Sequence, residues 1–116
     1  MPANVDVLRQ AVIGHRIVSA ERRKHALFIT LDNGTEVRLA NSNDCCAYTE
    51  LDAFLLHPER VDHVIMGVGT TEYYNRWHIY ADYGEVLELT VGWSAGNLGY
   101  YGYGFYIDVL PSVAAS

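Results

Sequence analysis

The chain has 116 residues, half of them hydrophobic and 19% charged, with a formal net charge of −6. This composition is typical of one folded domain and argues against a disordered chain. The excess negative charge repels phosphate backbones, so we expect no nucleic-acid partner, although Arg22, Arg23 and Lys24 form a local basic run.

Membrane insertion, secretion and a disulfide framework are not expected. No apolar run approaches the ~20 residues that span a bilayer, and residues 1–6 lack the basic and apolar regions of a signal peptide. The two cysteines, Cys45 and Cys46, are adjacent and cannot build a disulfide framework. We therefore expect a cytoplasmic protein with no membrane partner and no cofactor.

The first expected element is a short amphipathic helix. Val5, Leu8 and Val12 share one helical face, Asn4 can cap the start, and Gly14 ends the helix. A helix this short needs support from other elements, so we expect it to cover a sheet.

Strands are expected next, over residues 17–20, 25–31 and 35–39. The last two runs have apolar side chains at odd positions, which predicts a hairpin. A three-residue loop with a left-handed Gly34 pairs Ile29 with Val37 and keeps apolar side chains on one face.

A second hairpin is predicted from the same pattern. Residues 75–81 and 85–91 flank residues 82–84. A loop of those three residues pairs Ile79 with Leu87, whereas a two-residue loop would set apolar positions against polar ones. The first register is favoured because each buried side chain contributes about 1.5–3 kcal/mol.

The remaining elements complete a single α+β domain over residues 1–110, with residues 111–116 as a frayed tail. Residues 63–68 and 104–110 are predicted strands, and residues 50–56 are a predicted second helix capped by Thr49. We expect about six mostly antiparallel strands in a curved sheet or half-barrel, with two short helices.

A polar row is predicted on one strand of the second hairpin. Arg76, His78, Tyr80 and Asp82 alternate, so their side chains project together, and Glu88 joins them from the partner strand. One interpretation is a solvated face with cross-strand charge pairs. The other is a ligand or proton-transfer site with the candidate catalytic residues His78, Tyr80, Asp82 and Glu88, assisted by Asp44 or Cys45.

The adjacent cysteines permit a second type of site. In an extended chain they point to opposite faces, so joint chelation of one ion is awkward, and burial of both thiols is the simpler interpretation. The alternative is a metal site assembled by the fold from Cys45, Cys46, His57 and His63.

Residues 67–105 hold both tryptophans and eight of the ten glycines. Tyrosine-rich, glycine-flexed surfaces are typical of protein-binding sites. Alternatively, the rings simply pack over an open end of the sheet. The candidate binding residues are Tyr73, Tyr74, Trp93, Asn97, Tyr100, Tyr101 and Tyr103.

Four segments carry a family resemblance: 44–50 (DCCAYTE), 57–63 (HPERVDH), 77–82 (WHIYAD) and 89–94 (LTVGWS). Together they resemble a family of small uncharacterised proteins from actinobacteria and their bacteriophages, especially phages of mycobacteria. The likeness runs from about Gly14 to Ile107. It implies a phage or prophage origin and a role inside the infected cell, but no activity or catalytic residue.

We therefore expect a non-catalytic, protein-binding accessory protein that acts in the host cytoplasm. Its expected partner is a host or phage protein, or a second copy of itself in a homodimer. Two alternatives stay open: a small enzyme or ligand-binding protein that uses the polar row, and a small metal-binding domain.

Overall fold

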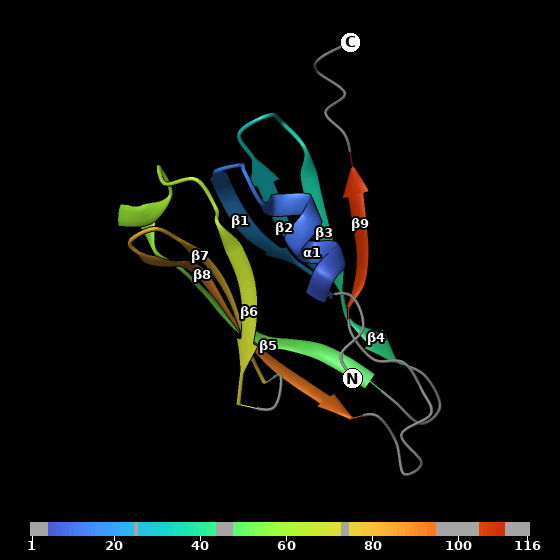
Figure 1. Cartoon of the computed structure of the whole chain (residues 1–116). Coiled ribbons are helices and arrows are strands. Elements are labelled where there is room, and N and C mark those ends of the chain that lie inside the picture. The colour runs from blue at the N-terminus through green and yellow to red at the C-terminus, as the bar shows by residue number, and fades with distance from the viewer. Residues whose placement is uncertain (1–4, 25, 44–47, 73–74, 95–104, 111–116) are drawn as a thin grey trace.

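The computed structural model describes residues 5–24, 26–43, 48–72, 75–94 and 105–110, with the main chain alone at residues 42–43 and 93–94. These residues form two antiparallel sheets, one α-helix and a 3-10 turn (Figure 1). The elements are α1 (Val5–Val12), β1 (Ile17–Arg23), β2 (Ala26–Leu31), β3 (Glu36–Ala40), β4 (Ser42–Asn43), β5 (Tyr48–Leu56), η1 (Pro58–Arg60), β6 (Gly67–Thr71), β7 (Arg76–Ala81), β8 (Gly84–Ser94) and β9 (Tyr106–Leu110).

The strands divide into a four-stranded sheet, ordered β1-β2-β3-β9, and a five-stranded sheet, ordered β4-β5-β8-β7-β6. Every neighbouring pair is antiparallel. The antiparallel prediction is confirmed, but the fold is mainly β. It has two sheets in place of one curved sheet, and more strands than the six expected.

The predicted second helix is wrong, because residues 50–56 lie in β5. Thr49 and Leu51 are buried two residues apart, which is the strand period, and β5 pairs along most of β8. A run this short is compatible with either element, and cross-strand pairing and burial decided the outcome.

The first hairpin has the predicted register and loop. Ile29 lies opposite Val37, and Leu27 lies opposite Leu39. Gly34 has a φ of 85°, so it adopts the left-handed conformation that glycine tolerates best. The N–H of Leu31, the last residue of β2, donates to the Thr35 carbonyl at 2.8 Å and closes the three-residue loop.

The second hairpin has the predicted register but a different loop. Ile79 lies opposite Leu87 as expected. However, Ala81 pairs with Gly84, so the turn is shorter than predicted, and the register shifts between Ile79 and Tyr80. Val86 is the extra residue of this β-bulge, which restores the apolar pairing along the rest of the hairpin.

The hydrophobic core draws on both sheets and on α1, whose Leu8 and Val12 are fully buried. The helix is confirmed, and it contacts β6 and β9 (Figure 1). Trp77 and Phe105 are both 1% exposed and pack edge to face with ring centroids 5.2 Å apart.

The strand predicted at residues 63–68 is only partly confirmed, because β6 begins at Gly67 and not at residue 63.

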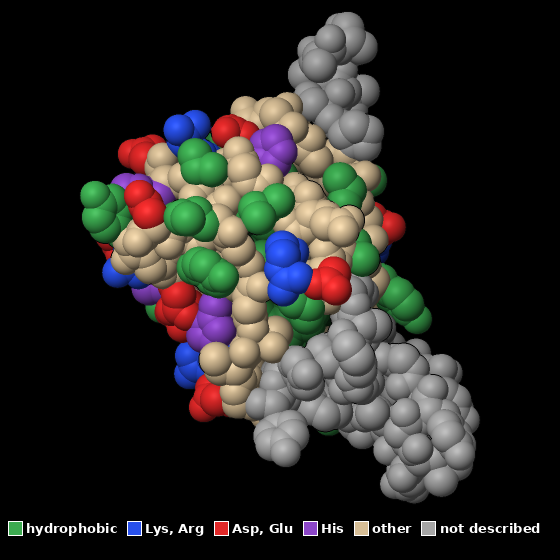
Figure 2. All heavy atoms as spheres, in the orientation of Figure 1, with side chains coloured by type: hydrophobic (Ala, Val, Ile, Leu, Met, Phe, Trp, Pro, Cys, Tyr) green, Lys and Arg blue, Asp and Glu red, His purple; other side chains and the backbone are tan. Residues whose placement is uncertain are grey.

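Figure 2 shows the hydrophobic side chains of one face as separate spots among polar and charged ones. Such scattered exposure is normal for a folded domain. In the described part of the chain, no helix has the length and apolar character required to span a bilayer.

Candidate functional site

The polar row lies on the outer face of β7. Trp77, Ile79 and Ala81 are buried, while the alternate residues Arg76, His78 and Tyr80 are more exposed. His78 lies directly opposite Glu88, and the Arg76 guanidinium approaches the Glu88 carboxylate at 3.4 Å. The structure therefore brings Arg76, His78 and Glu88 together.

Glu85 belongs to the same face, although the alternation of the sequence does not place it there. In a regular strand, residues 85 and 88 would point to opposite sides. The bulge at Val86 removes this opposition: Val86 and Leu87 are both fully buried, and Glu85 and Glu88 both point outward. Bulges commonly re-aim a side chain in this way.

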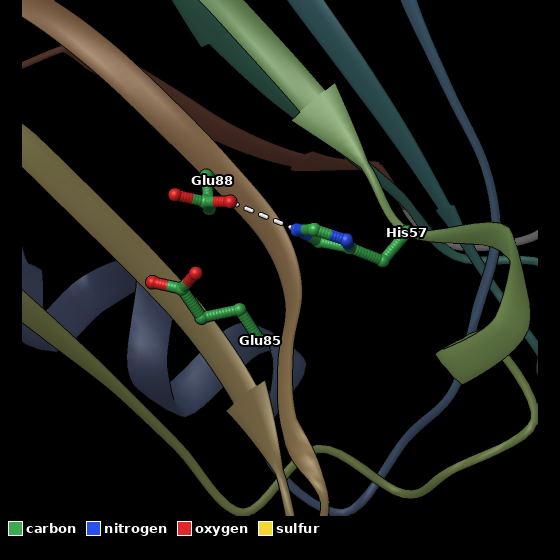
Figure 3. Close-up of side chains that lie close together, drawn as sticks. All are labelled: His57, Glu85 and Glu88. Atoms are coloured by element: carbon green, nitrogen blue, oxygen red, sulfur yellow. Dashed lines mark hydrogen bonds and ion pairs between the residues drawn. The ribbon is translucent and has the colours of Figure 1, made fainter.

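His57 reaches the cluster from the end of β5. Its main-chain N–H donates to the Val86 carbonyl at 2.8 Å, which fixes its position beside the bulge. The His57 Nε2 atom lies 2.8 Å from a Glu88 carboxylate oxygen, and its Nδ1 atom lies 3.5 Å from Glu59. Potential ligand atoms of His57, Glu85 and Glu88 all lie within 4.8 Å of one another (Figure 3).

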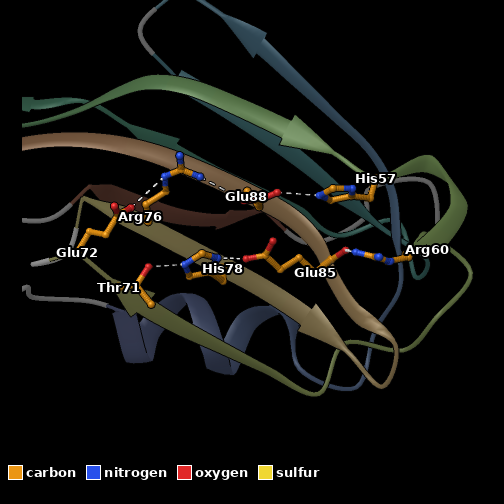
Figure 4. Close-up of polar contacts among 8 residues, drawn as sticks. All are labelled: His57, Arg60, Thr71, Glu72, Arg76, His78, Glu85 and Glu88. Carbon is orange, nitrogen blue, oxygen red and sulfur yellow. Dashed lines mark hydrogen bonds and ion pairs between the residues drawn. The ribbon is translucent and has the colours of Figure 1, made fainter.

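Further contacts extend this cluster across the sheet (Figure 4). The Glu85 carboxylate contacts the Nδ1 atom of His78, and the Nε2 atom of His78 lies 2.7 Å from the Thr71 hydroxyl. Arg60 donates to the Glu85 carbonyl at 2.9 Å. The result is a row of imidazoles and carboxylates on three paired strands, beside a shallow hollow of about 420 Å³ lined by Gly69, Thr70, Thr71, His78, Tyr80, Gly84 and Glu85.

Two residues of the predicted catalytic set make other contacts. Asp82 pairs with His63 at 3.1 Å, and His63 packs edge-on against Tyr83. Tyr80 lies opposite Glu85 and lines the hollow with it, but its ring lies over Gly67, where an added Cβ atom would be 2.5 Å from the phenol oxygen. Of the predicted metal set, His57 and His63 thus have separate acidic partners, and Cys45 and Cys46, like Asp44, lie outside the described residues.

The predicted binding residues are largely outside the described chain. Trp93 is placed by its main chain, which pairs with Thr49 across β5 and β8. The residues not described are Tyr73, Tyr74, Asn97, Tyr100, Tyr101 and Tyr103.

A second candidate surface lies on the outer face of the β1-β2-β3-β9 sheet. It is a hollow of about 510 Å³. Ala26 and Ala40, which are direct cross-strand partners, form its floor, and the rings of Phe28 and Tyr106 contribute to its lining. Arg23, Lys24, Arg38 and Asn41 complete the lining.

Two of the cations of this hollow, Arg23 and Arg38, pair with carboxylates of the same sheet. Arg23 lies 4.6 Å from the centre of the Phe28 ring and is bonded to Glu21, which raises the pKa of the Arg23 guanidinium. Arg38 pairs with Asp108 at 2.7 Å. The basic run at residues 22–24 was the sequence signal for this surface. Arg38 lies far from that run in the sequence, and the β2–β3 pairing brings it to the same hollow.

Comparison with known proteins gives a family but no activity. A family model described as "Domain of unknown function (DUF7448)" matches residues 10–107. No curated protein and no solved structure matches the chain.

Proposed function

We propose that this chain, which belongs to the DUF7448 family of domains of unknown function, is a non-catalytic module that binds an acidic segment of a partner protein. We further propose that it is a phage accessory protein, that it acts in the host cytoplasm, and that its partner is a host or phage protein. The observation that carries the binding proposal is the aromatic and cationic hollow over Ala26 and Ala40.

The hollow has the composition of a protein-recognition site. Tyrosine and arginine are enriched among the residues that dominate binding energy at interfaces. The alanine floor and the Phe28 and Tyr106 rings offer apolar surface to one anchoring side chain, whose burial contributes about 1.5–3 kcal/mol. Tyr106 is 61% exposed, so this surface is accessible.

The charge of the hollow favours an acidic partner. The whole chain has only eight lysines and arginines, yet three of them line this one hollow. The ion pairs of Arg23 with Glu21 and of Arg38 with Asp108 are solvent-exposed, and exposed pairs contribute only about 0–1 kcal/mol. The guanidiniums can therefore turn toward carboxylates of a partner at little cost.

Lys24 provides a variant that separates binding from folding. Its φ of 55° is left-handed, a conformation in which glycine is more comfortable than lysine. Lys24→Gly therefore removes one cation of the hollow and relaxes the main chain, so we expect a fold at least as stable as that of the unmodified chain.

The test is fluorescence polarisation with a labelled peptide that carries one tryptophan flanked by glutamates. We expect saturable binding that Tyr106→Ala and Lys24→Gly each weaken about tenfold, equivalent to about 1.4 kcal/mol. Tyr83→Ala, which removes a 73% exposed ring from the β7–β8 turn of the other sheet, is the matched control and should bind normally. Equal affinity for a lysine-flanked peptide, or unchanged binding by both variants, would refute the proposal.

The tyrosine- and glycine-rich segment is a second candidate contact surface, favoured by its composition. Its test is recovery of partner proteins from host and phage-infected lysates by chains with and without Tyr100→Ala and Tyr101→Ala. Unchanged recovery by a folded double variant would count against this surface. Recovery of the chain itself would point to the homodimer.

A further inference from the structure

We propose that His57, Glu85 and Glu88 form a binding site for a first-row divalent metal ion, a property that goes beyond the peptide-binding function. One imidazole nitrogen and two carboxylate oxygens lie within 4.8 Å of one another. On a shared ion, such atoms lie roughly 3–4 Å apart, because each metal–ligand bond is about 2.0–2.2 Å. Small side-chain rotations are therefore enough to close the set.

The positions of the three ligands are fixed by the main chain. Glu85 and Glu88 both belong to β8, where the bulge at Val86 turns them to one face. His57 is held against the same bulge by its hydrogen bond to the Val86 carbonyl. One local irregularity thus supplies the geometry for all three side chains, and sites built on strands hold their ligands more accurately than sites on loops.

Each proposed ligand also has an orienting neighbour. Metal-binding histidines commonly direct their second ring nitrogen at a carboxylate, and the Nδ1 atom of His57 lies 3.5 Å from Glu59. The Nε2 atom then faces the cluster, where it contacts Glu88 at 2.8 Å.

The carboxylates are oriented in a similar manner. The Glu85 carboxylate contacts His78, which is itself held by the Thr71 hydroxyl. Arg76 approaches one oxygen of Glu88 and leaves the other oxygen facing His57, which favours ligation through a single oxygen. The proposed ion replaces the direct contact between the His57 ring and the Glu88 carboxylate.

The ligand set selects the class of metal. An imidazole nitrogen suits zinc, iron, copper and nickel, whereas Ca²⁺ takes six to eight oxygen ligands. Three protein ligands leave at least one position for water, and the side chains are only partly buried. We therefore expect Zn²⁺ to bind most tightly and Mn²⁺ less tightly, because Mn²⁺ favours carboxylate over imidazole ligands, and we expect Ca²⁺ to bind at least tenfold more weakly than Zn²⁺.

The experiment is calorimetric titration of the untagged full chain with each of the three ions. One Zn²⁺ per chain is expected. Glu88→Gln and His57→Gln should each lower the affinity about a hundredfold, and His78→Gln about tenfold, as expected for an orienting residue. Circular dichroism checks that each variant is folded, and Glu85→Gln replaces Glu88→Gln in the test if the latter does not fold.

Two controls locate the ion. His63→Gln removes an imidazole that pairs with the Asp82 carboxylate at 3.1 Å. Among the described residues, His63 belongs to no group of three potential metal ligands, so this variant should bind the ion normally. A chain carrying Cys45→Ser and Cys46→Ser should also bind normally. The proposal is overturned if the folded chain shows no saturable binding, if Glu88→Gln binds as tightly as the unmodified chain, or if loss of the thiols abolishes binding.

Discussion

Replacing Trp77 by alanine should destabilise the domain more than any change on its surface. Trp77 is 1% exposed and packs edge to face against Phe105. Burial of 150–250 Å² at 25 cal/mol per Å² corresponds to about 4–6 kcal/mol, and tryptophan truncations in protein cores typically cost about 3–5 kcal/mol. We expect Trp77→Ala to lower the free energy of unfolding by about 4 kcal/mol.

Urea denaturation followed by circular dichroism measures this loss. A domain of this size has a total stability of about 5–15 kcal/mol, so the midpoint should fall by a large fraction. Tyr83→Ala on the adjacent turn is the control: Tyr83 is 73% exposed and loses an edge contact with His63, so its cost should stay below about 1 kcal/mol. A cost below about 1.5 kcal/mol for Trp77→Ala would contradict the buried position of β7 and the register built on it.

Two further substitutions test local features of the fold. Gly34→Ala should cost about 1 kcal/mol in urea denaturation because Gly34 has a φ of 85°, and Gly34→Asn should cost less; equal losses would argue against the left-handed turn. Arg9→Met removes two hydrogen bonds to the Val68 carbonyl, at 3.0 and 3.3 Å, and should accelerate amide exchange in α1 while leaving the β2–β3 hairpin protected. Unchanged exchange in α1 would show that this contact does not hold the helix on the sheet.

The register of both hairpins was predictable because the alternation of apolar residues is local. A slip of one residue would expose Ile29 or Ile79, which are both fully buried. The identity of β5 was not predictable in the same way. The pattern of residues 50–56 fits either a helix or a strand. The choice depends on pairing with β8, which lies much later in the chain.

The polar cluster was only partly predictable. The alternation on β7 correctly placed His78 and Arg76 on the face of Glu88. Glu85 was missed because a bulge breaks the period of two and leaves no clear sequence signal. His57 was missed as a neighbour of Glu88 because its approach depends on the β5–β8 pairing, after β5 itself had been predicted as a helix.

The extra residue at Val86 also makes the charge of this surface depend on the bulged pairing of β8 with β7. If β8 paired with β7 without the bulge and at unchanged chain length, strict alternation would expose Val86 and turn Glu85 toward the interior, beside Leu87 and opposite Ala81. An unpaired carboxylate there would be costly. Relatives that keep two acidic residues three positions apart at this place should therefore also keep an apolar residue at the position of Val86, which is fully buried.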